Sequence, residues 1–78
     1  MISIKYFGAV AEATKRPSEN LELKSSSLED VLKELHLKYN LKNIPVKLAL
    51  NQEIINSTEG VQVKKNDELA VLPPFAGG

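Results

Sequence analysis

The end of the chain carries the residues whose types and order point most directly to chemistry. The last six residues read Pro73-Pro74-Phe75-Ala76-Gly77-Gly78. Each proline fixes its own φ angle and has no backbone donor, so neither a strand nor a helix can continue through the pair. Six extended residues span roughly 20 Å, at about 3.3–3.6 Å per residue. The sequence therefore predicts a stiff tail long enough to enter the active site of another protein.

The side chains of this tail become very small toward its C-terminal end. Glycine has no Cβ, so the segment Ala76-Gly77-Gly78 fits a channel too narrow for other residues and can lie against a nucleotide. The group that remains for chemistry is the terminal carboxyl of Gly78, and we expect it to be the catalytic group. A frayed end without function is the alternative. The Pro-Pro-Phe sequence, directly after an apolar strand, argues against that alternative.

The composition excludes several classes of function. A chain of 78 residues forms one domain with little room for an enclosed active-site pocket. Ten basic and ten acidic residues balance, so no overall field attracts nucleic acid or a membrane surface. The absence of cysteine excludes a disulfide framework, a thiolate metal site and cysteine-based persulfide chemistry. With no signal-peptide pattern, we expect a cytoplasmic carrier, binding module or subunit, without a metal site, rather than a free-standing enzyme.

Five segments have the alternation or the β-branched content of strands. They are residues 2–7, 21–23, 46–50, 53–55 and 68–72. Alternation in the first segment places Tyr6 toward the core and Phe7 on the opposite face. In the last segment, Val71 should point toward the core and Leu72 away from it. Residues 16–18 mark a loop before the second strand.

One segment predicts a long helix. Its apolar side chains recur at helical spacing on one face, at Leu28, Val31, Leu32, Leu35 and Tyr39. Ser27 is a suitable N-cap with Asp30 as its capping-box partner, and Asn40 can take the left-handed conformation that ends a helix. His36 falls on the polar flank, where we expect a solvated side chain. A shorter helical turn is possible at residues 9–13.

The order of these elements is strand, strand, helix, strand, short strand, strand. It indicates an α+β protein with a mixed sheet and one main helix packed on one face, which is the β-grasp, or ubiquitin-like, arrangement. A right-handed crossover through the helix would place the first and last strands side by side and parallel at the centre of the sheet. We predict a β-grasp domain over residues 1–72 and an extended Gly-Gly tail over residues 73–78.

The sheet face away from the helix is the predicted docking surface. Phe7 and Leu72 should be neighbours there, beside the root of the tail, and Ile54 extends the same apolar area. Single exposed apolar residues are common, but a patch beside a reactive terminus favours a partner contact. The predicted partner-binding residues are Phe7, Ile54, Leu72, Pro73, Pro74, Phe75, Ala76 and Gly77.

Several motifs along the whole chain resemble a known family, the small, sulfur-carrying subunits of molybdopterin synthase, which are ubiquitin-like proteins of the MoaD/ThiS type. The motifs are Ile2-x-Ile4-x-Tyr6-Phe7-Gly8, Leu48-Ala49-Leu50-Asn51-Gln52, Asp67-Glu68-Leu69-Ala70-Val71-Leu72 and the tail Pro73-Pro74-Phe75-Ala76-Gly77-Gly78. The tail is the most specific of them. The chain departs from the family at Ala11, where an arginine is common, which leaves in doubt any salt bridge to a partner from that position.

The resemblance implies a β-grasp protein whose Gly78 carboxyl is adenylated by an E1-like adenylyltransferase that uses ATP and magnesium. A sulfur donor protein then supplies the sulfur of a C-terminal thiocarboxylate. The tail docks in the large catalytic subunit of molybdopterin synthase, in an assembly expected to be a heterotetramer. There the sulfur passes to cyclic pyranopterin monophosphate, which becomes molybdopterin during molybdenum cofactor biosynthesis. No cofactor is expected to stay bound to the small subunit.

Other functions share parts of this pattern. A sulfur carrier for thiamin, cysteine or tRNA thiolation, or a ubiquitin-like protein modifier, would also end in Gly-Gly. These proteins generally lack the Pro-Pro-aromatic sequence before it. A passive ubiquitin-like binding domain is a third possibility, and it would keep its activity without residues 77–78.

Overall fold

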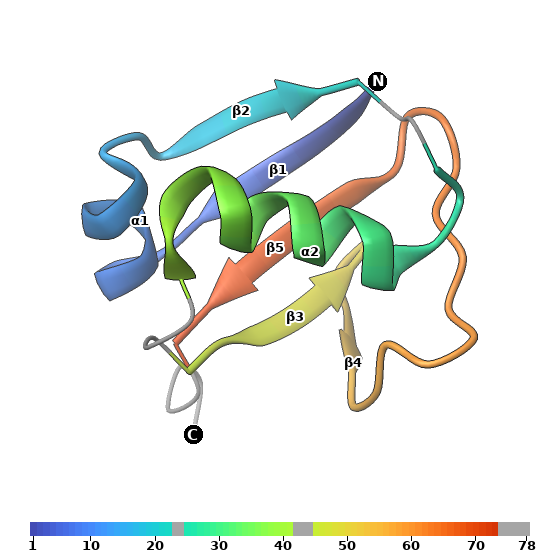
Figure 1. The fold of residues 1–78 in the computed structure, drawn as a ribbon. Helices are drawn as coiled ribbons and strands as arrows, with labels where there is room; N and C mark the ends of the chain where they lie inside the picture. Colours follow the sequence, from blue (N-terminus) through green and yellow to red (C-terminus); the bar gives the residue numbers. More distant parts are fainter. Residues whose placement is uncertain (23–24, 42–44, 74–78) are drawn as a thin grey trace.

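The computed structural model describes residues 1–22, 25–41 and 45–73, and it shows one mixed sheet crossed by a helix (Figure 1). The sheet has five strands in the order β2-β1-β5-β3-β4. Their bounds are β1 Ile2–Tyr6, β2 Ser18–Leu21, β3 Lys47–Leu50, β4 Glu53–Ile55 and β5 Glu68–Leu72. Helix α2 (Leu28–Tyr39) lies across one face, and the short helix α1 (Gly8–Thr14) lies beside the end of β1. This is the β-grasp fold predicted from the order of the elements.

The central pair of strands is parallel, as predicted. β1 and β5 run side by side, with Ile4 opposite Leu69 and Tyr6 opposite Val71. β2 pairs antiparallel with β1, while β3 pairs antiparallel with both β5 and β4. β5 therefore has a hydrogen-bonded neighbour on each side. The strand that leads into the tail is held more firmly than either edge strand.

The core lies between the sheet and α2. The side chains with the least exposure come from both layers: Ile2, Ile4, Leu28, Leu35, Leu41, Leu69, Val10 and Val71. Because successive strand residues face opposite sides, the alternation in β1 and β5 delivers every second side chain to this layer. Burial of one leucine or isoleucine side chain contributes about 1.5–3 kcal/mol. The helical spacing in α2 and the strand spacing in β1 and β5 thus predicted the core correctly.

The start of α2 differs from the predicted capping box. Ser27 occupies the N-cap position, but its side chain makes no capping hydrogen bond. Instead the Ser25 hydroxyl accepts from the Ser27 N–H at 3.1 Å and donates to the Asp30 carboxylate at 2.8 Å. The Ser27 backbone forms a bridge with Gln62, which holds it in extended geometry. The end of α2 is as predicted, because Asn40 adopts the left-handed conformation with φ of 55°.

The second strand was predicted in the wrong place. The sequence predicted a strand over residues 21–23, whereas β2 is Ser18–Leu21, so the two share Leu21, and residue 23 lies outside the described residues. The Pro17 carbonyl accepts a hydrogen bond from the Tyr6 N–H at 2.9 Å, so pairing with β1 begins directly after the proline. Leu21 ends the strand opposite Ile2. A loop signal at residues 16–18 concealed the start of the strand, and helix α1 is likewise longer than the predicted turn.

The turn between β3 and β4 is tied to the start of β5. Asn51 and Gln52 have φ of 51° and 71°, which is the backbone geometry of a tight hairpin turn. The Asn51 N–H donates to the Glu68 carbonyl at 2.7 Å, and the Asn51 side chain accepts from the Glu68 N–H at 3.0 Å. The predicted turn at Asn51-Gln52 is confirmed, and it helps to hold β5 in register.

Candidate functional site

The root of the tail, Leu72 and Pro73, is built into the folded domain. Leu72 is the last residue of β5, and Pro73 after it is buried. The Phe7 N–H donates to the Val71 carbonyl at 3.1 Å, which continues the contact between the two central strands past the end of β1. The Pro73 ring lies against the backbone of Gly8, the first residue of α1. The strand β5, the end of β1 and the start of α1 therefore meet where the tail begins.

The rest of the predicted reactive segment lies outside the described residues. This applies to Pro74, Phe75, Ala76, Gly77 and Gly78. Their roles therefore stay predictions. The described residues fix where the tail starts and which strand carries it.

The sheet face away from α2 holds the predicted docking residues. Phe7 has 44% of its surface exposed and Ile54 has 50%, while Leu72 is half-buried. Tyr6 is opposite Val71 in the parallel pair of β1 and β5. The next residues along the chain, Phe7 and Leu72, therefore lie at neighbouring positions on the outer face, which is the side of the sheet away from α2. Ile54 lies opposite Ala49, which in turn lies opposite Ala70. We call Phe7, Ala70, Leu72 and Ile54 the outer patch.

Charged side chains border this outer patch. Lys5 forms an ion pair with Glu68 at 3.1 Å, and both side chains are well exposed to solvent. Lys47 lies opposite Leu72 on β3 and is exposed. An exposed ion pair contributes at most about 1 kcal/mol to folding, so these groups are better explained by solubility and by contacts outside the domain. Apolar residues inside a charged border are the usual anatomy of a protein–protein interface.

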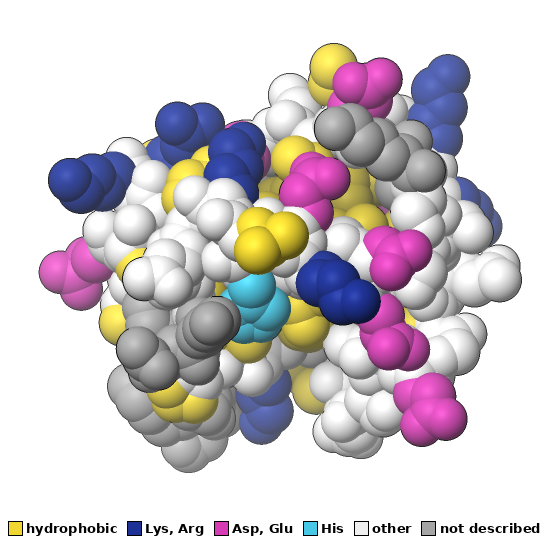
Figure 2. Space-filling model, in the orientation of Figure 1, with side chains coloured by type: hydrophobic (Ala, Val, Ile, Leu, Met, Phe, Trp, Pro, Cys, Tyr) yellow, Lys and Arg dark blue, Asp and Glu magenta, His cyan; other side chains and the backbone are white. Residues whose placement is uncertain are grey.

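The side of the molecule on which α2 lies carries many charged side chains (Figure 2). Figure 2 views the domain from the side of α2, where acidic side chains gather mainly on the right and basic side chains are spread over the face. His36, shown in cyan, is half-buried on this side, and its Nδ1 is a buried atom with no hydrogen-bond partner among the described residues. The prediction of a solvated histidine was therefore only partly correct.

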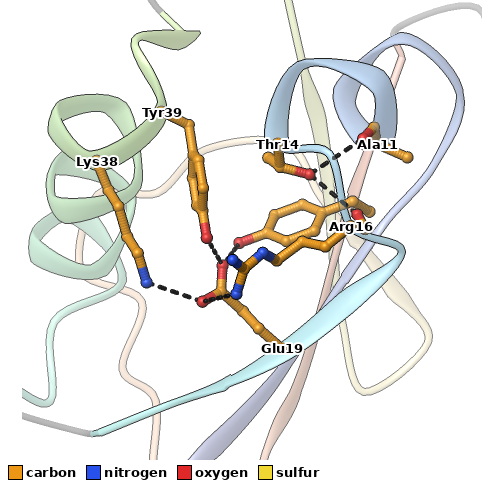
Figure 3. A network of polar contacts seen from close by, with 7 residues as sticks. Ala11, Thr14, Arg16, Glu19, Lys38 and Tyr39 are labelled. Atoms are coloured by element: carbon orange, nitrogen blue, oxygen red, sulfur yellow. Dashed lines mark hydrogen bonds and ion pairs between the residues drawn. The ribbon is translucent and has the colours of Figure 1, made fainter.

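A buried carboxylate, that of Glu19, organises the end of α2, and no pattern in the sequence predicted it. Only 7% of the Glu19 side chain is exposed. It accepts hydrogen bonds from the Tyr6 hydroxyl at 2.6 Å, from the Tyr39 hydroxyl and from Lys38 Nζ at 2.9 Å (Figure 3). Arg16 lies 3.6 Å from the same oxygen that Lys38 contacts. The carboxylate thus joins β2, β1 and α2.

The electrostatics of this network indicate a structural role. Burial opposes the charged form of Glu19, but hydrogen bonds from Tyr39, Tyr6 and Lys38 outweigh that effect and lower its pKa to about 2. Burial, followed by the contact with Glu19, raises the pKa of Tyr6 above its ordinary value, and the same causes raise the pKa of Tyr39. The carboxylate stays charged and the phenols stay neutral at neutral pH. None of these groups is therefore suited to transfer protons there.

The described part of the chain offers no other catalytic centre. No group of three histidine, cysteine, aspartate or glutamate side chains in residues 1–22, 25–41 and 45–73 is placed to hold a metal ion. An open hollow of about 420 Å³ lies between α2 and the β3–β4 edge, and Lys47 is the one titratable residue along it. Neither described helix is long and apolar enough to span a bilayer.

The fold and the tail root define a small β-grasp protein whose central strand, β5, leads into the C-terminal segment through Pro73. The model of the ThiS family matches residues 4–78, and the chain belongs to that family. A molybdopterin synthase sulfur carrier subunit from Arabidopsis thaliana is 37% identical over 81 residues, which cover 99% of this chain and 82% of that protein. The protein of the same name from Dictyostelium discoideum is 45% identical over 31 residues, covering 40% of this chain and 36% of that protein. The resemblance inferred from the motifs is confirmed.

Solved structures agree on the fold. One chain of the complex between subunits 1 and 2 of molybdopterin-converting factor from Helicobacter pylori superimposes with a TM-score of 0.69 at 25% identity. The match covers 99% of this chain and 97% of that chain. The small archaeal modifier protein 1 from Methanosarcina acetivorans superimposes with a TM-score of 0.73 at 27% identity, covering 99% and 95% of the two chains. The same fold thus occurs in a complex named for molybdopterin-converting factor and in a protein named as a modifier.

Proposed function

We propose that the chain is the sulfur carrier subunit of a molybdopterin synthase and that its working group is the Gly78 carboxyl. The observation that carries this proposal is the tail root. A central strand with a hydrogen-bonded neighbour on each side ends at a buried proline, Pro73, and the sequence after it runs through Pro74, Phe75 and Ala76 to Gly77-Gly78. The family and the names of the sulfur carrier relatives support the same function.

The chemistry begins with activation of the tail. A carboxylate is a poor electrophile because it is charged and lacks a good leaving group. In the proposed first step, the Gly78 carboxylate oxygen attacks the α-phosphate of ATP on an E1-like enzyme. Pyrophosphate leaves and an acyl-adenylate forms. ATP and magnesium belong to that enzyme, so this chain needs no resident cofactor.

Sulfur enters at the second step. A sulfur nucleophile delivered by a donor protein attacks the acyl carbon, and AMP leaves with the electron pair of the bond that breaks. The donor holds its sulfur as a cysteine persulfide, so a second thiol then cleaves the S–S bond of the acyl disulfide that forms. This leaves the donor cysteine in a disulfide with that thiol and Gly78 as a thiocarboxylate. Cyclic pyranopterin monophosphate then receives this sulfur in the large subunit, and hydrolysis of the acyl group restores the Gly78 carboxylate. The absence of cysteine is consistent with this route, because no side-chain thiol of this chain takes part.

The outer patch is the proposed contact with the large subunit. Phe7 and Leu72 adjoin the tail root, so one partner can bind the patch and receive the tail together. The Helicobacter pylori structure is a complex of subunits 1 and 2 of molybdopterin-converting factor, and a comparable complex is proposed for this chain. A heterotetramer with two large and two small subunits is part of the proposal.

The test follows the mass of the chain through the reaction. The protein is incubated with its E1-like enzyme, ATP, magnesium and a sulfur donor, and intact mass spectrometry should show an oxygen-to-sulfur exchange. Addition of the large subunit and the pterin precursor should restore the original mass and yield molybdopterin. A variant without residues 77–78 should do neither while it remains folded. A chain that gains sulfur without forming molybdopterin would be a sulfur carrier for another thiolation pathway.

A second function has specific support. The similarity to small archaeal modifier protein 1 favours conjugation of Gly78 to lysine side chains as an alternative outcome of the same activation step. Incubation with ATP and a lysate of the source organism would then produce higher-mass adducts that contain an isopeptide bond. Their absence, together with efficient transfer of sulfur to the pterin, would favour the carrier.

A further inference from the structure

The contact between Gly8 and Pro73 is unusually close. Gly8 has φ of +54°, in the left-handed region that favours glycine, and a Cβ atom on it would lie 2.8 Å from Pro73 Cγ and 3.6 Å from Pro73 Cδ. Real Cβ atoms essentially never approach a heavy atom to 2.8 Å. Any side chain at position 8 would therefore require Pro73 or helix α1 to move.

Helix α1 is a firm support for this contact. Val10 is fully buried, and the Thr14 hydroxyl donates to the Arg16 carbonyl at 3.0 Å. Phe7 links α1 to the central sheet because its carbonyl accepts from the Val10 N–H at 3.1 Å while its own N–H donates to Val71. The backbone on one side of Pro73 is thus held by β5, and the surface beneath its ring is held by α1.

We propose that Gly8 is a positioning residue for the Gly78 carboxyl. Because glycine has no side chain, Pro73 can pack closely against α1. This packing sets the direction in which the backbone leaves β5. The inference rests on the proposed function, because direction matters only if the tail must reach a partner's active site. Five residues span at most about 17 Å when fully extended, so over that length a rotation of about 15° at the root would displace the tip by up to about 4 Å. Misplacement of reacting atoms by about 1 Å can already reduce a rate by about 100-fold.

The chain provides a matched control for backbone strain. Gly60 also has positive φ, of +74°, but a Cβ atom on it would meet nothing within 4 Å. Gly8→Val and Gly60→Val therefore introduce the same unfavourable backbone conformation, and only the first also pushes against Pro73. The two variants separate the seating of the proline from the general cost of replacing a left-handed glycine.

The experiment measures activation of the tail with the E1-like enzyme, as pyrophosphate released per unit time. We expect Gly8→Val to lower kcat by about tenfold or more and Gly60→Val to leave it within about twofold of the unsubstituted chain. Gly8→Val should still compete with the unsubstituted chain for the enzyme, with a similar inhibition constant, because the domain remains folded. Hydrogen exchange at the Phe7 amide should accelerate in Gly8→Val alone, since that amide bonds to the strand next to Pro73.

A rescue tests the contact itself. Pro73→Ala removes Cγ and Cδ, the atoms that a side chain at position 8 would meet. Combined with Gly8→Val it should recover part of the lost kcat, measured relative to Pro73→Ala alone. Equal kcat for Gly8→Val and Gly60→Val, or no recovery in the double variant, would overturn the positioning role while leaving the carrier function in place. Failure of the unsubstituted chain to be activated would overturn both.

Discussion

The backbone N–H of Phe7 donates to the carbonyl of Val71 at 3.1 Å, so the end of β1 is joined to the end of β5. This bond holds the Phe7 side chain beside Leu72 on the outer face. An exposed aromatic residue next to an apolar one is the kind of contact that dominates protein–protein binding energies. The same bond also brings the start of α1 to the tail root. In the proposed function, a partner that binds the outer patch would therefore also lie next to the start of the tail, because this backbone contact joins the two.

Truncation of the aromatic side chain should weaken docking. We expect Phe7→Ala to raise the Kd for the large subunit about tenfold, which corresponds to about 1.4 kcal/mol. The melting temperature should change little because Phe7 is 44% exposed. Calorimetric titration of the purified subunits measures the effect.

The control for this prediction is Leu37→Ala. Leu37 is 82% exposed and belongs to α2, on the other side of the sheet from the outer patch. Its truncation should leave the Kd unchanged. An equal loss of affinity from Leu37→Ala would place the interface on the helix side, and the outer patch would then have no role in docking.

Periodicity predicted most of the fold. Ile2, Ile4 and Tyr6 alternate in β1, and the apolar stripe of α2 repeats at helical spacing, so each segment identified its own buried face. β2 was misplaced because Pro17 reads as a loop and because the inward-facing side chain at position 19 is a glutamate. Polar groups are seldom buried, and nothing local marks this one as an exception.

Polar contacts between residues far apart in the sequence could not be predicted either, because no local pattern marks them. The partners of Glu19 include Tyr6, 13 residues away, and Tyr39, 20 residues away. Only the folded chain shows that three hydroxyl or ammonium groups converge on it. The Gly8–Pro73 contact is similar, because the sequence showed a glycine after a strand and could not show what lay above it.

The Glu19 network should make stability depend on pH. The folded-state pKa of Glu19, about 2, lies below its ordinary value of 4.5. Its contribution to stability is therefore complete above pH 4.5 and is lost as the pH falls toward 2. We expect Glu19→Gln to lower the free energy of unfolding by about 2–3 kcal/mol at pH 7. The difference between the two proteins should shrink steadily below pH 4.5.

Glu12→Gln provides the comparison. Glu12 is exposed on α1, and its replacement should change the unfolding free energy by less than about 0.5 kcal/mol at any pH. Urea unfolding at a series of pH values, followed by circular dichroism, supplies the measurements. A constant difference between Glu19→Gln and the unsubstituted chain from pH 7 to pH 2 would show that the carboxylate charge is not what stabilises the network.

Two neighbouring leucines of α2 should respond very differently to truncation. Leu35 is fully buried and Leu37 is 82% exposed. Leu35→Ala should cost about 2–5 kcal/mol of unfolding free energy because it leaves a cavity, whereas Leu37→Ala should cost less than about 0.5 kcal/mol. Thermal unfolding of the two variants tests the placement of α2 on the sheet. Similar losses at both positions would contradict the packing described for this helix.

Extension of the chain by one alanine after Gly78 should abolish activation. The new carboxylate would lie about 3.3–3.6 Å beyond its usual place, and a methyl group would enter a channel adapted to glycine. An alanine inserted after Gly60 adds the same mass in an exposed turn and should leave both activation and melting temperature unchanged.

The measurements are pyrophosphate release and Kd for the large subunit. Because the outer patch is untouched, the extended chain should still bind the large subunit and block the unextended one. An extended chain that is still activated at the normal rate would show that the reacting group is not the Gly78 carboxyl.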